Sequence, residues 1–368
     1  MGIYDDLGIK PIINASATLT KLGGSRMPAE VLEAMQAAAG AFVDVPLLQA
    51  RVGDRIAELT RNEAAFVSSG AAGGIVLAVA TLMAAPNEPD PMAYPMLKGI
   101  TRNEAIVFAS QRNGYDFAIV QTGASIVECD DTLDSFEAAI SGRTACLVWF
   151  AGALAAKSPP IEDVIAIARK HGVPVLVDAA AQIPPVSNLW HYTRVLGCEG
   201  VLFSGGKGMR GPQSAGLVLG SRALIAGCRR LSPPTQGIGR PLKVGKEELA
   251  GMLAAVQYTL AQDEGAMLEG YELIVQNWMK QLAGIAGVTA ERGFPSEAGQ
   301  PHARTIVRFD AGFRKTRDQV IGELKNGDVW IEVGVLADEP NALALNPQTL
   351  TREEADIVSA RLRQVLTS

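Results

Sequence analysis

Short apolar runs alternate with amphipathic segments along the middle of the chain. Five runs have the length and the β-branched content of buried strands. They are AIVFAS (105–110), SIVECD (125–130), CLVWFAG (146–152), VPVLVDAAAQ (173–182) and GVLFSGG (200–206). Helical segments such as IEDVIAIARK separate several of them. The alternation predicts an α/β fold with a mostly parallel central sheet.

Apolar side chains at helical spacing predict further helices on both sides of this region. The predicted ranges are 28–39, 48–60, 74–85, the segment GKEELAGMLAAVQYTLAQ and 351–366. The run ARTIVRFD (303–310) is expected to start a smaller α+β portion. We therefore expect an N-terminal segment (1–50), a large α/β domain (51–250) and a small C-terminal α+β domain (251–368).

Composition narrows the possible partners of the chain. It has 368 residues, 48% of them hydrophobic, and a formal net charge of -6. Nucleic acids and anionic membranes need clustered positive charge, so neither is an expected partner. The longest apolar segments are too short to cross a bilayer, and MGIYDDLGIK contains no long apolar stretch of an export signal. A cytoplasmic protein is expected.

Cysteine and histidine spacing gives no indication of a metal site. The four cysteines form no CxxC pair, and the three histidines have no HExxH-like spacing. We expect reduced, mostly buried thiols and no metal.

Three groups of different chemistry follow predicted strands. Asp178 ends one strand, Lys207 follows VLFSGG, and a Ser68-Ser69-Gly70 turn leads into a helix. In an open parallel sheet, ligands lie at the carboxyl ends of the strands, so these groups are expected to converge. A carboxylate, an amine and a cluster of backbone N–H groups together suggest pyridoxal phosphate as the cofactor.

Each part of this cofactor requires a particular group. Lys207 would form a Schiff base with the aldehyde, and Asp178 would keep the pyridine nitrogen protonated. Backbone N–H groups at the helix start would bind the phosphate together with the Ser204 hydroxyl. The phosphate residues so predicted are Ser69, Gly70, Ala71, Ala72 and Ser204.

Each feature alone also has an ordinary structural interpretation. A lysine among glycines is usually solvated, and an aspartate at a strand end is commonly a turn former. A phosphate-binding P-loop is excluded, because Lys207 is followed by Gly-Met-Arg-Gly-Pro and not by Ser or Thr and a helix. The combination of the three features favours the cofactor site.

Four stretches carry a resemblance to a known family. INASATLTKLGGS (13–25), VDAAAQIPP (177–185), FSGGKGMRGPQSAGLVLG (203–220) and GRPLKVGKEELAG (239–251) resemble the selenocysteine-synthase-like branch of fold-type I pyridoxal phosphate enzymes. Within that branch the chain is most similar to the D-glucosaminate-6-phosphate ammonia-lyase group. The resemblance implies an aspartate-aminotransferase-like fold, the roles given above for Lys207 and Asp178, and a Gln182 that reaches the ring hydroxyl.

The chain departs from the pattern of the family in two places. Residues 61–65 read Arg-Asn-Glu-Ala-Ala where relatives often have Gly-Ala-Glu-Ala-Ala. No aromatic residue stands where many relatives stack a ring on the pyridine; SQRNGYD (110–116) occupies that region. Arg112 is therefore a candidate for covering the cofactor or binding substrate, with a solvated loop residue as the alternative.

Cations in predicted loops suit a small anionic substrate that carries an amino group. The candidates are Arg112, Arg240, Lys243 and Arg304, and Arg210 also lies in such a loop. The resemblance favours α-proton abstraction and β-elimination, giving a 2-oxo acid and ammonia, and a homodimer or higher homo-oligomer. Racemisation, aldol cleavage and transamination stay open, and selenium transfer to seryl-tRNA or a non-catalytic protein are remoter alternatives.

Overall fold

The computed structural model describes residues 2–368 and divides them into two compact units. One unit is Met27–Ala261; the other combines the chain up to Arg26 with Gln262–Ser368. This division differs from the expected boundaries at 50 and 250 because a strand before Arg26 pairs with one more than 300 residues later. Met1, the first residue of the expected N-terminal segment, lies outside the described residues.

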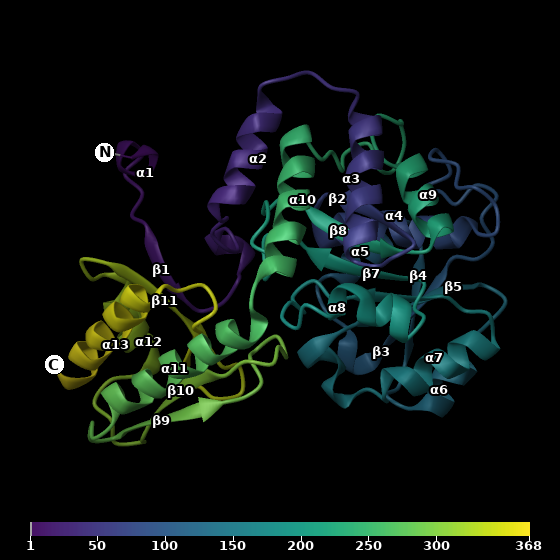
Figure 1. Ribbon diagram of the computed structural model, residues 1–368. Coiled ribbons are helices and arrows are strands. Elements are labelled where there is room, and N and C mark those ends of the chain that lie inside the picture. The colour runs from purple at the N-terminus through teal and green to yellow at the C-terminus, as the bar shows by residue number, and fades with distance from the viewer. Residues whose placement is uncertain (1) are drawn as a thin grey trace. The chain divides into compact units, whose positions relative to one another are not determined.

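A seven-stranded sheet forms the centre of the unit Met27–Ala261 (Figure 1). Only β8 runs antiparallel to its neighbours; the other pairings are parallel, which confirms the predicted mostly parallel sheet. In spatial order the strands are β2 (Ala64–Ser68), β8 (Gly216–Gly220), β7 (Gly200–Ser204), β6 (Val175–Asp178), β5 (Thr144–Phe150), β3 (Glu104–Phe108) and β4 (Ser125–Cys129).

Helices cover both faces of this sheet, and successive side chains of a strand enter opposite cores. Ala65 and Val67 join one core, whereas Phe66 joins the other. This explains why the strands read as continuous apolar runs. One face packs against α4 (Gly70–Ala84), α5 (Asp116–Val120) and α9 (Arg222–Leu231). The other packs against α3 (Val45–Leu59), α6 (Leu133–Ala139), α7 (Ile161–Lys170), α8 (Asn188–Trp190) and α10 (Lys246–Ala261), and α2 (Ala29–Ala39) lies against α10.

The outer edge of β2 is closed by side chains instead of another strand. The Gln49 amide donates to the Val67 carbonyl at 2.6 Å and accepts from the Val67 N–H at 3.4 Å. Arg229 donates to the neighbouring Ala65 carbonyl at 3.4 Å. One glutamine thus satisfies both backbone groups of a residue that would otherwise present an open edge.

The second unit contains a five-stranded sheet and the smaller α+β portion predicted from the sequence. Its strands are, in spatial order, β1 (Ile12–Ala15), β11 (Trp330–Val335), β12 (Ala342–Leu345), β10 (Arg304–Phe309) and β9 (Val288–Gly293). Its helices are α1 (Ile3–Asp6), α11 (Glu264–Leu282), α12 (Arg317–Lys325) and α13 (Arg352–Thr367). Buried Trp278 on α11 donates to the Ala355 carbonyl at 2.8 Å and so joins α11 to α13.

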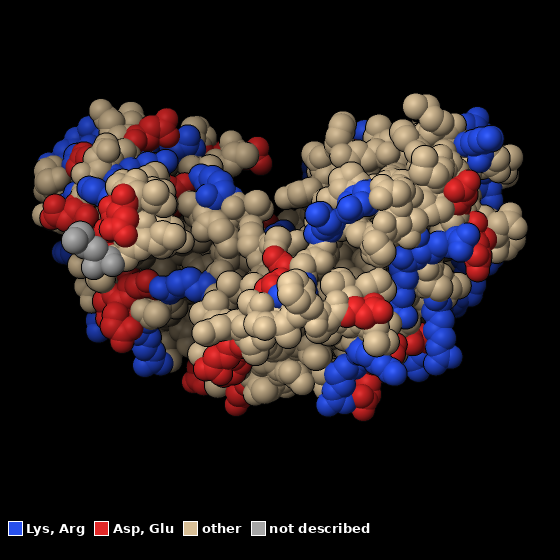
Figure 2. All heavy atoms as spheres, turned by 90° about the horizontal axis from the view of Figure 1, so that it is seen from above, with Lys and Arg blue, Asp and Glu red and all other residues tan. Residues whose placement is uncertain are grey.

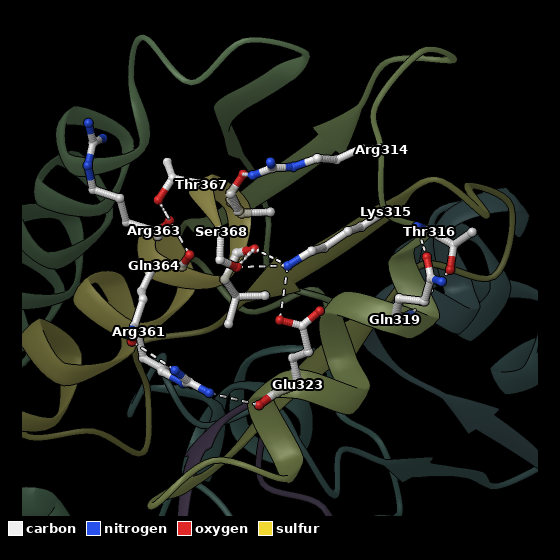
Figure 3. Close-up of polar contacts among 12 residues, drawn as sticks. Arg314, Lys315, Thr316, Gln319, Glu323, Arg361, Arg363, Gln364, Thr367 and Ser368 are labelled. Atoms are coloured by element: carbon white, nitrogen blue, oxygen red, sulfur yellow. Dashed lines mark hydrogen bonds and ion pairs between the residues drawn. The ribbon is translucent and has the colours of Figure 1, made fainter.

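Cations cap the end of α13 (Figure 3). Arg314 donates to the Leu366 carbonyl at 3.2 Å, and Lys315 donates to the Val365 carbonyl at 2.7 Å. Lys315 also forms a 3.0 Å ion pair with Glu323. Carbonyls in the last turn of a helix lack partners within the helix, so these contacts satisfy them and oppose the negative end of the helix dipole.

Charged side chains of both signs are interspersed over the face of the molecule shown in Figure 2. Within residues 2–368, no helix combines the length and the apolar character needed to span a membrane. The four cysteines are free and buried, as the sequence predicted.

Candidate active site

Strand register brings the predicted site residues to one edge of the seven-stranded sheet. Ser68 pairs with Gly216, and Gly216 pairs with Ser204, so the ends of β2 and β7 lie in one row. Asp178, the last residue of β6, pairs with Leu202 of β7. The residues that follow these strands therefore meet at a common carboxyl edge, as the sequence predicted.

Asp178 is buried and Lys207 is half-buried, and the two carry opposite charges close enough to affect each other. Asp178 is only 8% exposed, and its carboxylate accepts a 2.9 Å hydrogen bond from the Ala180 N–H. Burial raises the pKa of Asp178, while that hydrogen bond and the charge of Lys207 oppose the rise. Burial likewise lowers the pKa of Lys207, and the charge of Asp178 opposes that fall. A lysine with a lowered pKa is a stronger candidate for covalent and proton-transfer chemistry than a solvated one.

The glycines around Lys207 allow close contact with the loop that follows Asp178. A Cβ at Gly208 would lie 2.0 Å from the Ile183 carbonyl oxygen, so no larger residue fits there. A Cβ at Gly206 would lie 2.2 Å from the Gln213 side-chain oxygen. The Arg210 N–H closes a turn onto the Lys207 carbonyl at 3.0 Å. Packing of both backbones thus fixes the lysine beside the aspartate.

The start of α4 fits a phosphate group. Ser69 is the N-cap residue, and in the described structure its side chain makes no capping hydrogen bond to the helix. The first-turn N–H groups of Gly70, Ala71 and Ala72 are thus not capped by it and lie at the positive end of a 15-residue helix. Gly216 approaches this turn so closely that a Cβ there would lie 2.3 Å from the Gly70 carbonyl carbon. Because such an array of N–H groups and dipole is suited to an anion, these residues fit the phosphate of the predicted cofactor.

Gln182 and Ser204 lie on the segments that carry the charged pair. Gln182 is buried four residues beyond Asp178, and its carbonyl accepts from the Asn188 amide at 2.7 Å. Ser204 is the last residue of β7, and its N–H donates to the Ala180 carbonyl at 3.2 Å. Both therefore belong to the same carboxyl edge as Lys207.

The structure places Arg112 in a network of carboxylates beyond β3. Its guanidinium forms ion pairs with Asp116, at 2.5 Å, and with Glu128 of the edge strand β4. These carboxylates raise the pKa of Arg112 above its usual value. Arg112 is therefore bound to two carboxylates of the protein itself. Its contact with cofactor or substrate stays a prediction.

A buried glutamine beside Arg112 was missed by the sequence reasoning. Gln111 is 0% exposed; its side-chain oxygen accepts from the Phe150 N–H at 2.7 Å, and its amide donates to Ser158 at 2.9 Å. Phe150 pairs with Asp178, and the next N–H, of Ala151, donates to the Asp178 carbonyl at 2.9 Å. Gln111 thus fixes the strand end beside the candidate carboxylate. Nothing in the polar sequence around Gln111 indicates that its side chain is buried and bonded to a strand end.

The other predicted substrate cations occupy two different places. Arg240 and Lys243 line a cavity of about 580 Å³ beside the β2 edge, together with Arg229. Leu242 of the same wall would lie 3.7 Å from a Cβ at Gly73, in the first turn of α4. This cavity therefore adjoins the phosphate-suited helix start. Arg304 belongs to the other unit, where its guanidinium lies 3.8 Å from Glu297.

Comparison with known proteins agrees with this arrangement. Residues 49–244, more than half of the chain, match the family described as aminotransferase class-V. The chain is 31% identical to a 5'-C-glycyluridine monooxygenase-decarboxylase from Streptomyces sp over 99% of its length and 92% of that protein. It is 28% identical to a D-glucosaminate-6-phosphate ammonia lyase from Salmonella typhimurium over 99% of its length and 97% of that protein.

Solved structures support the same assignment and confirm the resemblance seen in the sequence. A D-glucosaminate-6-phosphate ammonia-lyase structure superimposes with a TM-score of 0.83 at 28% identity, over 100% of this chain and 98% of that one. An alanine–glyoxylate aminotransferase from Nostoc sp. shares the fold, with a TM-score of 0.63 at 16% identity and full coverage of both chains. The chain therefore belongs to the class-V aminotransferase family and is a pyridoxal phosphate-dependent enzyme of fold type I.

Proposed function

We propose that the protein is an ammonia-lyase acting on a small anionic amino acid or amino sugar acid. The reaction is α-proton abstraction followed by elimination of a β-hydroxyl group as water, and hydrolysis of the resulting enamine yields a 2-oxo acid and ammonia. The observation that carries this proposal is the Lys207–Asp178 pair at the sheet edge that also holds the α4 N-terminus, in a chain similar throughout its length to a D-glucosaminate-6-phosphate ammonia lyase.

Each residue of the candidate site has its own role in the proposed reaction. Bound pyridoxal phosphate supplies a ring that accepts the electrons released at the substrate α-carbon. Asp178 would hold the proton on the ring nitrogen, and the first turn of α4 with Ser204 would bind the phosphate. Gln182 would reach the ring hydroxyl. Lys207 would hold the cofactor and move the proton at the substrate α-carbon.

Lys207 is suited to that second role by its surroundings. Burial lowers its pKa, so more of the neutral amine is present near neutral pH than for a solvated lysine. The turn closed by Arg210 holds its backbone in place. The amine is thus both available as a base and fixed in position.

We infer that Arg240 and Lys243 bind a distal anionic group of the substrate, such as a phosphate. The cavity that they line adjoins the first turn of α4 through Leu242. Arg112 and Arg304 are weaker proposals, because each is already close to a carboxylate.

A cytoplasmic homodimer or higher homo-oligomer is also proposed, on the resemblance to fold-type I enzymes. Their active sites are completed across a two-fold interface, to which the segment around Arg240 would contribute. Light scattering tests this proposal, and a fully active monomer would contradict it.

A second candidate reaction follows from the 31% identity to the Streptomyces monooxygenase-decarboxylase. Both chemistries begin by withdrawing electrons from the substrate α-carbon, so the described residues serve either. The candidates differ in products: decarboxylation releases carbon dioxide, and a monooxygenase consumes oxygen.

One experiment separates these candidates. The holoenzyme is incubated with amino sugar acids, their 6-phosphates, and D- and L-serine or threonine, with and without oxygen. Ammonia and a 2-oxo acid in an oxygen-independent reaction, without a keto-acid acceptor, support the lyase. Oxygen uptake with carbon dioxide release supports the second candidate, an acceptor requirement indicates transamination, and loss of optical rotation alone indicates racemisation.

A further inference from the structure

A buried glutamine side chain continues the larger sheet beyond the end of β3. The pairing of β3 with β5 stops at Leu147, whereas β5 runs on to Phe150. The Ala151 N–H points towards β6 and bonds the Asp178 carbonyl at 2.9 Å, so the Phe150 N–H before it points to the opposite side, where β3 no longer pairs. The Gln111 side-chain oxygen accepts from this N–H at 2.7 Å. One side chain therefore supplies the hydrogen bond that a longer β3 would have made.

The Phe150 N–H has no solvent to replace this acceptor. Phe150 is 2% exposed and Gln111 is 0% exposed. A buried donor that loses its acceptor is costly, so without the glutamine oxygen the end of β5 must shift to find another. Phe150 pairs with Asp178, which carries the candidate carboxylate. The position of this carboxylate is therefore linked to the hydrogen bond of Gln111.

Further hydrogen bonds hold the Gln111 amide in this orientation. Its Nε2 donates to the Ser158 hydroxyl at 2.9 Å. The Ser158 hydroxyl donates in turn to Asp131 at 3.2 Å, and the Ser110 hydroxyl donates to the same oxygen at 2.6 Å. The other oxygen of Asp131 accepts from the Ser110 N–H at 3.2 Å. Because both polar atoms of the amide have partners, the side-chain oxygen is kept pointing at Phe150.

This network joins the carboxyl ends of neighbouring strands. Asp131 follows β4, Ser110 and Gln111 follow β3, and Phe150 is the last residue of β5. The chain returns from Phe150 to the network at Ser158, so Gln111 holds both ends of this loop. Ligands bind at the carboxyl ends of parallel strands, and a fixed edge keeps the groups that meet a ligand in place.

We propose that Gln111 is a positioning residue for Asp178. The proposal rests on the proposed role of Asp178 at the ring nitrogen of pyridoxal phosphate, and not on the identity of the substrate. Gln111 holds the strand end beside Asp178 and so keeps the carboxylate at the place where it stabilises the ring proton. Electrostatic attraction falls with distance, and a hydrogen bond weakens as its angle departs from linear. A displaced carboxylate therefore lowers the proton affinity of the ring nitrogen.

The test follows the ring nitrogen directly. Holoenzyme is prepared with pyridoxal phosphate isotopically labelled at the pyridine nitrogen, and nitrogen NMR is recorded against pH. Gln111→Leu keeps the bulk of the side chain but has no acceptor. In this variant the titration midpoint of the ring nitrogen should fall by about one pH unit, which is a loss of about tenfold in proton affinity. Asp178→Asn should lower the midpoint further.

Two variants test whether the effect is specific. A protonated glutamate has the same acceptor and donor as glutamine, and burial favours that form, so Gln111→Glu should restore the wild-type midpoint. Asn62→Leu is the matched control. The Asn62 amide also joins separate segments, since it donates to the Leu189 carbonyl at 2.7 Å and accepts from Thr193, but it lies before β2, at the amino edge of the sheet. Asn62→Leu should lower the thermal midpoint and leave the ring-nitrogen titration unchanged.

Ser158→Ala provides the test if Gln111→Leu does not fold. It removes the acceptor of the Gln111 amide at a half-buried position, so the fold should tolerate it. The titration midpoint of the ring nitrogen should fall by a smaller amount than in Gln111→Leu, because the glutamine oxygen is still present but less firmly held.

Three results would overturn the proposal. An unchanged midpoint in Gln111→Leu, or in Ser158→Ala where only that variant folds, while Asp178→Asn lowers it, would leave the role of Asp178 intact without Gln111. A midpoint as low in Gln111→Glu or Asn62→Leu as in Gln111→Leu would show a general loss of packing. An unchanged midpoint in Asp178→Asn would remove the role of Asp178 and this proposal with it. Ammonia release enters none of these measurements, so the lyase proposal is tested separately.

Discussion

Two groups of charged residues in this protein differ in their exposure to water and in whether their surroundings favour the charged form. At the end of α13, Lys315 contacts a helix carbonyl and the carboxylate of Glu323, which is itself half in water. At the carboxyl edge of the larger sheet, Asp178 is buried and Lys207 is half-buried, and removal from water shifts the pKa of each toward its neutral form. Cations that bind the carbonyls at a helix end stabilise the fold, whereas a pair whose charged forms are disfavoured has the shifted pKa values that are typical of functional sites.

Substitution of the lysine in each group should produce the largest difference, and that difference is in catalytic activity. Lys207→Ala should lower kcat by at least about a thousandfold, because it removes both cofactor attachment and the proposed proton carrier. Lys315→Ala should leave kcat and KM unchanged. Steady-state kinetics measures both, and borohydride reduction followed by peptide mapping should locate the cofactor on Lys207. A cofactor attached to another lysine would contradict the assignment.

The next effect concerns the carboxylates. Asp178→Asn should still bind pyridoxal phosphate but lose about a hundredfold or more in kcat, because a neutral amide does not hold the proton on the ring nitrogen. Glu323→Gln is the control and should not change activity. Activity of Asp178→Asn within a few-fold of the wild type would remove the proposed role.

Lys315→Ala, which should leave activity unchanged, should lower the stability of the fold. Lys315→Ala should lower the free energy of unfolding by about 1 kcal/mol, because it leaves the Val365 carbonyl and Glu323 without their cation. Asp178→Asn in the apoprotein should show a different dependence on pH. The folded pKa of Asp178 is raised, so its stabilising contribution is present at acid pH and is lost as pH rises through that pKa.

Denaturant titration of the apoprotein at several pH values measures this difference. The stability of Asp178→Asn relative to the wild type should therefore increase from acid to neutral pH. A constant difference across that range would show that the Asp178 carboxyl has no raised pKa.

The smallest expected effect is on the titration of Lys207 itself. The charge of Asp178 raises the lysine pKa, against the larger lowering by burial. Removal of that charge in the Asp178→Asn apoprotein should therefore lower the pKa of Lys207 further. The midpoint of its reaction with an amine-directed reagent, followed by mass spectrometry against pH, should shift to lower pH. An unchanged midpoint would show that the two groups are not in electrostatic contact.

Much of the larger sheet and of the candidate site could be predicted from the sequence. Buried parallel strands appear in the sequence as continuous apolar runs. Their carboxyl ends lie at one edge of the sheet, independently of the conformation of the connecting loops. Asp178, Lys207 and Ser69 therefore could be assigned to one site before any contact was known. The predicted helical segment IEDVIAIARK matches α7 at both ends, because the acidic residues of its first turn and the basic residues of its last turn are local signals.

The remainder depends on contacts that no local pattern contains. Pairing of β1 with β11 joins residues 12 and 330, and nothing in either segment specifies its partner. The role of Gln111 depends on Phe150 and Ser158, which lie 39 and 47 residues away. Arg210 has a left-handed backbone conformation with a φ of 54°, for which arginine has no intrinsic preference.

The glutamine that closes the β2 edge has a consequence for how the protein behaves at high concentration. A flat apolar strand with open N–H and C=O groups is a template on which another chain can add a strand, and repeated addition yields aggregates. AAFVS of β2 has the composition of such a template, and Gln49 occupies its hydrogen-bonding positions with a side chain that cannot propagate. Replacement of Gln49, which lies about fifteen residues upstream of the strand, should therefore leave the Val67 N–H and C=O as an open edge.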